Sequence, residues 1–189
     1  MDKKVRVRFA PSPTGNLHVG GARTALFNYA FAKRHKGDFV LRIDDTDLDR
    51  NVDGSVTALM NDLLWLGISW DEGIMPDGSV KGNSGPYRQS DRLSIYKDHA
   101  IDLVKKGLAY YCFLPDDFDG PKNFYRDLDL SLALDKISKG DSFVIRFKVP
   151  KGDLTFFDDI RGMVSFSTDV IDDFVLIRSN GVPTYNFAT

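Results

Sequence analysis

The chain begins with an alternation of apolar and charged residues that is typical of a β-strand. Residues 5–9, Val-Arg-Val-Arg-Phe, alternate in this way, and the prolines and glycine of residues 11–15 end the strand in a bent loop. Apolar positions recur at helical spacing over residues 17–36, with a basic end and Gly37 as the predicted C-cap. Residues 39–43 return to strand, so the order predicts a βαβ unit with a parallel sheet and a right-handed crossover.

Two further helices are predicted by the same spacing. One covers residues 56–66 and is stopped by Gly67, and the other covers residues 93–106 and is stopped by Gly107. Between them, residues 75–87 are rich in Gly, Pro and Asn, which indicates an exposed loop.

After Gly107 the pattern changes to shorter pieces. Residues 109–113 and 142–149 favour β structure, residues 130–138 favour a short helix, and residues 173–188 contain a hydrophobic strand, a turn at Asn180-Gly181 and a second short run. The predicted fold class is α/β, a Rossmann-like parallel sheet that is incomplete and carries an inserted α+β module. The predicted segments are 1–107 for the first half of the Rossmann-like domain, 108–172 for the insertion, and 173–189 for the return to the sheet.

Charge and composition limit the possible partners and the compartment. With 25 Lys+Arg against 27 Asp+Glu, the formal net charge is -2, so any contact with RNA must be local. A single cysteine and three scattered histidines are poor material for a structural zinc site or a disulfide. With no signal-like amino terminus and no long apolar run, we expect a cytoplasmic protein without a membrane partner.

The turn between the first strand and the first helix can hold a phosphate. Pro11 stiffens the loop, Gly15 frees it, Gly20 and Gly21 leave backbone room beside a ligand, and His18 adds a side-chain donor at the helix N-terminus. The alternative is that the glycines only permit tight packing and that His18 is an ordinary capping residue. The stretch matches neither a Walker loop nor the G-x-G-x-x-G spacing of a dinucleotide fold.

Several motifs carry a family resemblance. His18-Val-Gly-Gly21 resembles the HIGH signature of class I aminoacyl-tRNA synthetases in its glutamyl form, and residues 8–15, 22–28 and 41–47 are similar to glutamyl-tRNA synthetases. Glutaminyl relatives characteristically carry Glu-Pro-Asn-Gly where this chain has Ser-Pro-Thr-Gly at 12–15. The resemblance extends to residues 65–73, 86–90, 144–148 and 182–186.

The resemblance implies a fold of the HUP/class I synthetase type and a ligase. Such an enzyme activates L-glutamate with ATP to glutamyl-adenylate and transfers glutamate to the 3' end of tRNA-Glu, with Mg²⁺ carried in by ATP, and the insertion binds the acceptor stem. His18 would be the catalytic residue, which binds ATP phosphates and stabilises charge. The ATP-binding residues implied are Pro11, Thr14, Gly15, His18, Gly20 and Gly21.

The resemblance also implies a pocket for the amino acid. Arg8 matches the arginine that recognises the side-chain carboxylate of glutamate, although an arginine in such a pattern can also simply point outward from an edge strand. Ala10 and Ser12 match pocket-lining positions, and Tyr185 matches a tyrosine that closes the pocket. Asp44 departs from the family, which usually has Glu there to pair with the substrate ammonium, and Asp reaches about 1.5 Å less far.

The family places Asp45, Thr46 and Asp47 near the tRNA 3' end, whereas an alternative for the acidic residues is that they cap the next helix. Many bacterial relatives bind zinc in the insertion, but only Cys112 stands in that region here, so we predict no zinc. The KMSKS-type loop and the anticodon-binding domains of the family are absent, so the chain is expected to be an amino-terminal part with weak activity alone.

Two other functions stay open. A short paralogue that glutamylates a modified base in tRNA-Asp shares the pocket, and a non-catalytic fragment that binds nucleotide or the tRNA acceptor would share the fold. A generic nucleotidylyltransferase is disfavoured by Arg8 and by the Arg-Ile-Asp-Asp-Thr-Asp motif. We expect a monomer, and charging of tRNA-Gln is left open.

Overall fold

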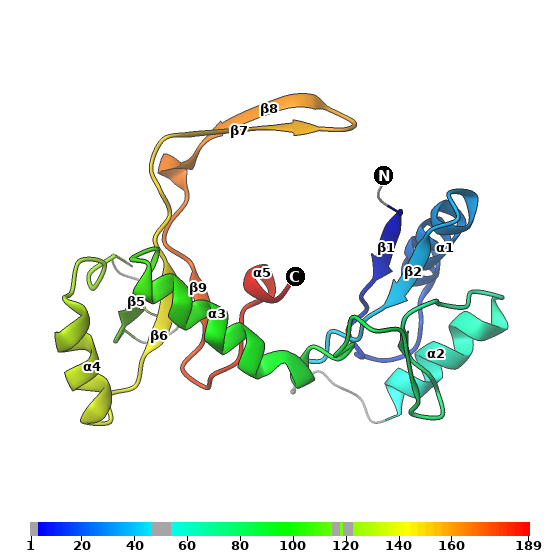
Figure 1. Cartoon of the computed structure of the whole chain (residues 1–189), viewed down its shortest axis with the longest axis horizontal. Coiled ribbons are helices and arrows are strands. Elements are labelled where there is room, and N and C mark those ends of the chain that lie inside the picture. The colour runs from blue at the N-terminus through cyan, green and yellow to red at the C-terminus, as the bar shows by residue number, and fades with distance from the viewer. Residues whose placement is uncertain (1–3, 47–53, 115–117, 119–122) are drawn as a thin grey trace. The chain divides into compact units, whose positions relative to one another are not determined.

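The chain folds as two compact units, Met1–Arg92 and Leu93–Thr189 (Figure 1). Each unit encloses a hydrophobic core of its own. The computed structural model describes residues 4–46, 54–114, 118 and 123–189. The division lies before α3 (Leu93–Lys105), not at the predicted residue 107, because α3 packs against β5 (Ala109–Cys112) and β9 (Val175–Ile177) of the second unit.

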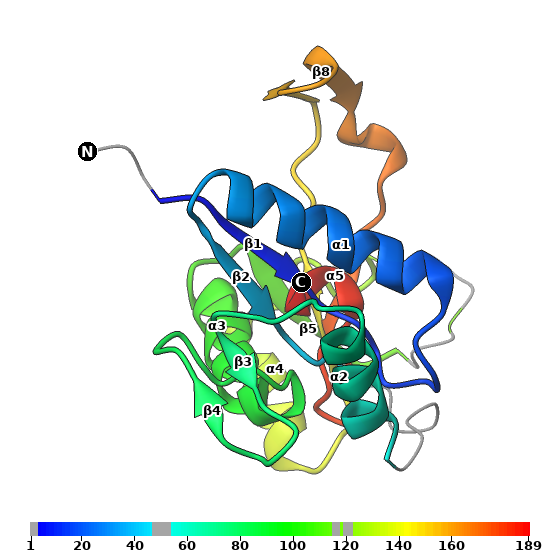
Figure 2. The same ribbon diagram turned by 90° about the vertical axis from the view of Figure 1, so that its right-hand side faces the viewer.

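A parallel βαβ unit forms the centre of the first unit, as predicted. β1 (Arg6–Phe9) pairs with β2 (Asp38–Leu41) in parallel, in a register that sets Phe9 opposite Leu41. The connecting helix α1 (Val19–Arg34) lies against one face of the two strands (Figure 2). The charged positions of the β1 alternation are exposed while Phe9 is buried, so the period of two in the sequence corresponds to the two faces of the strand.

The rest of the first unit closes its core. α2 (Ser55–Trp65) buries Leu59, Met60 and Leu63 in the same cluster as Trp70, and a short antiparallel pair joins β3 (Gly73–Ile74) to β4 (Val80–Lys81). The loop predicted over residues 75–87 is exposed at residues 77–85, but it also contains β4 and the buried Tyr87. The unit ends in the short helix η2 (Ser90–Arg92).

The end of α1 differs from the prediction that Gly37 is its C-cap. The C-cap residue is His35, and Lys36 takes the left-handed conformation with φ of 51°. The Gly37 N–H donates to the carbonyl of Ala32 at 2.8 Å, which completes a Schellman motif with Lys36 at its left-handed position. Gly37 is required for another reason, because a Cβ there would lie 2.4 Å from the carbonyl oxygen of Val5.

In the second unit, β6 (Val144–Phe147) is the middle strand of an antiparallel sheet with the order β5-β6-β9. α4 (Leu130–Ser138) begins and ends where the sequence predicts. The predicted return of residues 173–189 to the Rossmann-like sheet differs from the structure, since β9 pairs with β6, and the last run forms the helix α5 (Tyr185–Ala188). Across the described ranges, no helix combines the length and the apolar character needed to cross a membrane.

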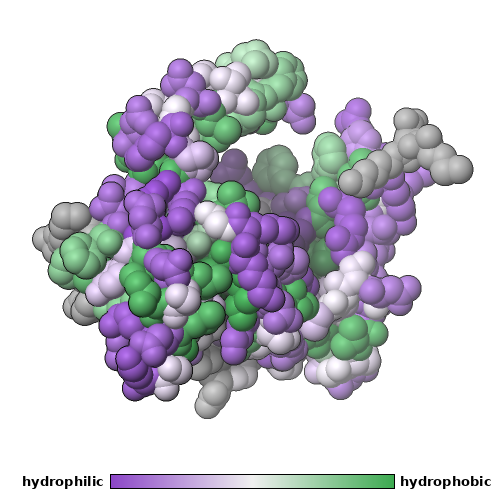
Figure 3. Space-filling view, turned by 60° about the vertical axis from the view of Figure 1, so that its left-hand side comes forward, coloured by the Kyte–Doolittle hydropathy of each residue, from purple (hydrophilic) through white to green (hydrophobic). Residues whose placement is uncertain are grey.

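A hairpin of the second unit was not predicted from the sequence. β7 (Asp153–Asp158) and β8 (Gly162–Ser167) pair over their full lengths and lead into η3 (Thr168–Val170), and the hairpin stands away from the β5-β6-β9 sheet (Figure 1). Phe157, Ile160 and Met163 of the hairpin are exposed. Hydrophobic surface lies beside hydrophilic surface at the top of Figure 3. The adjacent Phe156 and Phe157 break the alternation that would have indicated a strand.

Candidate functional site

The carboxyl ends of the two parallel strands bring two parts of the predicted site together, the segment after β1 and Asp44. The Arg42 N–H donates to the carbonyl of Phe9 at 3.0 Å, and the Asp44 N–H donates to the carbonyl of Pro11 at 3.0 Å. The segment Ala10–Ser12 therefore runs beside Asp44 at the edge of the sheet where α/β proteins bind ligands. Pro13 is held there too, because its carbonyl accepts a hydrogen bond from Ser55 Oγ of α2 at 2.8 Å.

His18 is the N-cap residue of α1. Its Nδ1 accepts hydrogen bonds from the backbone N–H of Gly20 at 3.1 Å and of Gly21 at 3.4 Å. An accepting Nδ1 carries no proton, so in the neutral imidazole the proton lies on Nε2, which is left as a donor. His18 therefore caps the helix, as the alternative interpretation has it, and the cap selects the tautomer that keeps a donor on Nε2.

The N-terminus of α1 suits an anion for a second reason. The first turn contains no acidic residue, so no carboxylate of the helix competes for the positive end of the helix dipole. Gly15 has φ of 140°, a conformation that L side chains rarely adopt, and it lets the loop bend ahead of the helix.

Gly20 makes room for a side chain of the protein itself. A Cβ at Gly20 would lie 2.9 Å from Cε1 and 3.0 Å from Nδ1 of His18, so a larger residue would push the imidazole out of its cap. A Cβ at Gly21 would meet only the side chain of Leu17 at 3.0 Å and that of Phe9 at 3.8 Å. The space that the sequence analysis assigned to a ligand at Gly20 is thus needed first by His18.

Arg8 lies on β1 two residues after Arg6, and the strand period places both on the same face. Arg6 is committed to a bidentate pair, because its Nε and Nη2 each donate at 2.8 Å to the carboxylate of Glu72. This pair, with a further hydrogen bond from the Tyr87 hydroxyl at 2.7 Å, lowers the pKa of Glu72 to about 2. Arg8 is exposed and lies on the same face of β1 as Arg6.

Asp44 is buried and paired with a residue that the sequence analysis did not single out. Nε and Nη2 of Arg42 donate to the two carboxylate oxygens of Asp44 at 2.6 and 2.8 Å, and both side chains are less than 10% exposed. The spacing i, i+2 along an extended segment could have revealed this partner, since such residues share a face. A carboxylate offers about four acceptor positions, so Asp44 keeps capacity for one more donor.

Asp45 and Thr46 hold the segment that leads into η2. The N–H and Oγ of Ser90 donate to Asp45 at 2.9 and 2.8 Å, and Thr46 Oγ1 donates to Gln89 Oε1 at 2.8 Å. Asp45 thus acts as a cap for a later helix, close to the alternative drawn from the sequence. Asp47 lies outside the described residues.

Tyr185 belongs to the second unit, where it is the first residue of α5 and its side chain is 73% exposed. Cys112 is fully buried in β5. In the part of the chain that the structure describes, no group of three or more His, Cys, Asp or Glu side chains could hold a metal ion.

Comparison with known proteins gives concordant similarities. The family model described as class I tRNA synthetases (E and Q), catalytic domain, matches residues 4–118 and 121–189. A glutamate–tRNA ligase of Bdellovibrio bacteriovorus is 50% identical over 97% of this chain and 40% of its own length, and one of Carboxydothermus hydrogenoformans is 46% identical over 97% and 41%. This chain therefore spans about 40% of the length of these relatives.

Solved structures agree on the fold. A glutamate tRNA ligase from Elizabethkingia meningosepticum, in complex with its amino acid, superposes with a TM-score of 0.85 at 40% identity, over 98% of this chain and 41% of that one. The α/β fold of the class I synthetase type, predicted from the motifs, is confirmed by this similarity.

Proposed function

The chain belongs to the catalytic-domain family of the class I tRNA synthetases for glutamate and glutamine, and from this membership we propose its function. It is the amino-terminal part of an enzyme that activates L-glutamate with ATP and transfers it to the 3' end of tRNA-Glu. The observation that carries the proposal is the edge formed by β1, β2 and the N-terminus of α1, where Ala10–Ser12 run beside Asp44.

In the first step, a carboxylate oxygen of glutamate attacks the α-phosphorus of ATP. A mixed anhydride bond forms, the bond to the bridging oxygen breaks, and pyrophosphate leaves with its electron pair. No protein nucleophile takes part, so the contribution of the chain is positioning and electrostatic stabilisation. The Nε2–H of His18 and the N-terminus of α1 would supply donors to the phosphate oxygens whose charge increases.

The side chains at this edge fit ATP that brings its own metal. Donors at the turn are N–H groups and an imidazole, which suit phosphate oxygens, whereas a hard cation such as Mg²⁺ prefers oxygen ligands. The described residues offer no cluster of acidic side chains for it. Mg²⁺ bound to the phosphates would neutralise their charge.

Recognition of glutamate requires one positive and one negative group. Arg8 would bind the side-chain carboxylate with its planar guanidinium, which favours glutamate over glutamine. Asp44 would accept a hydrogen bond from the substrate ammonium, held in place by Arg42, and Ala10 and Ser12 would line the pocket.

Transfer to tRNA would use further segments of the chain. Asp45, Thr46 and Asp47 would lie near the tRNA 3' end, and the α+β module of the second unit would bind the acceptor stem. The chain would act without zinc, as part of a monomeric cytoplasmic enzyme. Charging of tRNA-Gln is a separate outcome of the assay below.

The test is glutamate-dependent ATP–pyrophosphate exchange by the complete protein, with and without tRNA-Glu. We expect exchange that His18→Ala reduces at least about 100-fold, the range in which loss of one oxyanion donor falls. His18→Asn is the matched control, because Asn also caps helices but lacks the imidazole donor. Equal activity of His18→Asn and the wild type would show that His18 contributes only as the N-cap of α1.

Substrate choice is tested by comparing glutamate with glutamine, and tRNA-Glu with tRNA-Gln and tRNA-Asp. Arg8→Ala should remove the preference for glutamate, and an unchanged preference would refute the pocket. Transfer to tRNA-Asp alone would instead indicate the paralogous function, and absence of exchange under every condition would make the protein a binding module.

A further inference from the structure

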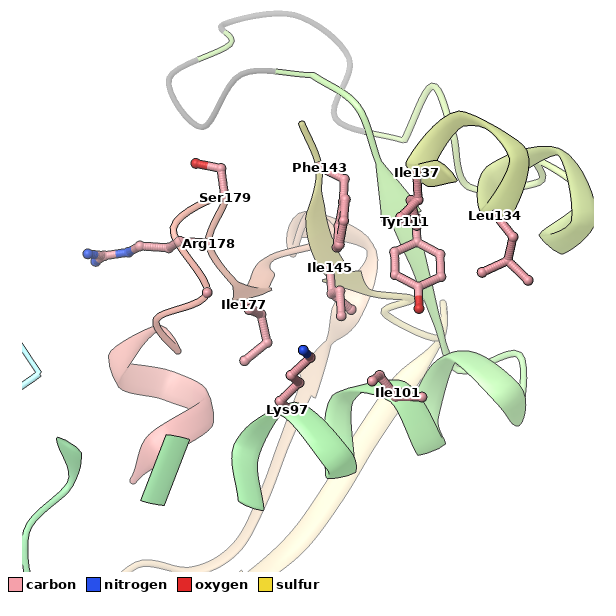
Figure 4. Close-up of a pocket in the computed structure, with 11 residues that line it drawn as sticks. Lys97, Ile101, Tyr111, Leu134, Ile137, Phe143, Ile145, Ile177, Arg178 and Ser179 are labelled. Atoms are coloured by element: carbon pink, nitrogen blue, oxygen red, sulfur yellow. The ribbon is translucent and has the colours of Figure 1, made fainter. Parts of the chain in front are cut away.

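The second unit contains a pocket of about 340 Å³ that the proposed ligase function does not use. Helix α3 forms one side, α4 a second, and the β5-β6-β9 sheet with the segment after β9 the rest (Figure 4). This volume lies near the lower end of the range of about 300–1,000 Å³ that is usual for small-molecule sites. Its apolar walls are Ile101, Leu134, Ile137, Phe143, Ile145 and Ile177.

Two polar side chains line this apolar space: Tyr111 is buried, whereas Lys97 is exposed. Lys97 extends from α3 toward Ile145 and Ile177, and the hydroxyl of Tyr111 points from β5 toward α3 (Figure 4). Among the described residues, neither the Lys97 ammonium nor the Tyr111 hydroxyl makes a hydrogen bond or ion pair. Burial raises the pKa of Tyr111, so this hydroxyl stays protonated and can donate.

The charge of the pocket has one sign. Its charged lining residues are Lys97 and Arg178, and none of the described residues that line it is a carboxylate. The side chain of Arg178 points away from the other lining side chains, so Lys97 is the cation that faces the interior (Figure 4). Lys97 is exposed to solvent, so its ammonium is available to pair with the anionic end of a ligand whose apolar part enters the pocket.

We propose that this pocket binds a small apolar monocarboxylic acid, whose branched or aromatic body contacts the isoleucine walls and whose carboxylate accepts hydrogen bonds from Lys97 and Tyr111. A neutral apolar ligand would leave both donors unpaired. Free phosphate would match the charge but would leave the six apolar walls without a partner, at the cost of desolvating a strongly hydrated ion. Only a ligand with both parts matches both features of the site.

The experiment uses the 189-residue chain with ¹³C-labelled isoleucine methyl groups and follows its NMR spectrum during titration with 4-methylpentanoate. Ile101, Ile137, Ile145 and Ile177 report on the pocket, while isoleucines of the first unit such as Ile43 are internal references. We expect saturable shifts confined to the pocket methyl groups. 4-Methylpentanamide, which has the same body without the charge, should bind about tenfold more weakly.

Two kinds of variant distinguish the contribution of the Lys97 charge to binding from that of the apolar cavity. Lys97→Gln should bring the affinity for the acid down to that for the amide, whereas Lys105→Gln, on the same helix and outside the pocket, should leave it unchanged. Leu134→Trp, at a half-exposed wall position, should fill the pocket and abolish binding of both ligands. Absence of pocket shifts at millimolar acid would overturn the proposal, and so would equal affinity for acid and amide. Binding is read without catalysis, so the result does not depend on ligase activity.

Discussion

At the residue scale, the position of the His18 side chain depends on the glycine at position 20. The imidazole can cap α1 only because position 20 has no side chain, and the cap in turn fixes which nitrogen carries the proton. The His-x-Gly spacing is therefore required by the geometry of the helix cap, whether or not a ligand is bound. Its glycine protects the orientation of its histidine.

Gly20→Ala tests this dependence. Alanine gains about 1 kcal/mol of helix propensity over glycine, but displacing His18 forfeits a cap of about 1 kcal/mol, so the net stability should barely change. Gly21→Ala gains the same propensity and meets only the flexible Leu17 side chain, so it should be more stable than Gly20→Ala by about 1 kcal/mol. Urea unfolding measures both, and equal stabilities of the two variants would contradict the coupling.

Glu72 provides a pH-dependent prediction. Hydrogen bonding to Arg6 lowers its pKa in the folded protein from the ordinary value of 4.5 to about 2. Because the folded pKa is the lower one, the stabilisation is present above about pH 4.5 and is lost as the pH falls toward 2. Arg6 is half-exposed, so we expect a contribution on the order of 1 kcal/mol.

Glu72 is the only glutamate of the chain, so ¹³C-glutamate labelling reports its carboxyl group alone. Its titration should fall well below pH 4.5 in the wild type and move up toward that value in Arg6→Ala. The difference in unfolding free energy between the wild type and Glu72→Gln should shrink with acidification. A Glu72 carboxyl that titrates near 4.5 in the folded wild type would refute the assignment.

The hydrogen-bond partners of the predicted site residues could not all be identified from the sequence. The sequence indicated that Asp44 and Asp45 belong to a site, and the structure places Asp44 beside the β1 loop, but neither Arg42 nor Ser90 was identified as a partner. Arg42 lies two positions away and could have been found from the strand period. Ser90 lies 45 residues from Asp45, and no local pattern encodes a contact at that separation.

At the scale of elements, the helix ends show how a single position decides local stability. α2 and α3 end with Gly67 and Gly107 in the left-handed conformation, whereas α1 places Lys36 there. For a residue with a Cβ, this conformation lowers the free energy of unfolding by about 1 kcal/mol or more relative to glycine. The lysine is therefore the weak point among these C-terminal caps.

Lys36→Gly should raise the unfolding free energy by about 0.5–1 kcal/mol, because glycine adopts the left-handed conformation without the Cβ clash. Gly37→Ala, one residue later, should lower it by about 1–3 kcal/mol, since its Cβ would meet the Val5 carbonyl. Thermal and urea unfolding of the two variants measure these opposite changes in unfolding free energy. A destabilised Lys36→Gly variant would show that the lysine side chain contributes more than its conformation costs.

Element prediction succeeded where periodicity and stop signals agree. The helices at 55–65, 93–105 and 130–138 follow from helical spacing that ends near a glycine. It failed at β7–β8, where exposed aromatic residues interrupt the alternation, and it assigned no element type to residues 185–188, where a short apolar run forms α5. Short apolar runs do not distinguish strand from helix, because both types can bury them.

At the scale of the whole molecule, the two units depend on different interactions. The first is built on the apolar cluster around Phe39 and Trp70, whereas the second also depends on a buried acid, Asp173. Asp173 accepts hydrogen bonds from the Tyr110 hydroxyl at 3.0 Å and the Val149 N–H at 2.9 Å, and it forms an ion pair with Arg126. This carboxylate joins β5, the segment after β6 and the segment before β9.

Asp173→Asn should destabilise the second unit by about 3–5 kcal/mol, the usual result when one partner of a buried pair is removed. The two tryptophans, Trp65 and Trp70, lie in the first unit, so tryptophan fluorescence follows that unit alone. Amide hydrogen exchange should become faster for residues of β5, β6 and β9, while the fluorescence transition keeps its midpoint. Because each unit has its own core, a mutation in one is expected to leave the other folded. A parallel shift of both signals would show instead that the two units unfold as one cooperative body.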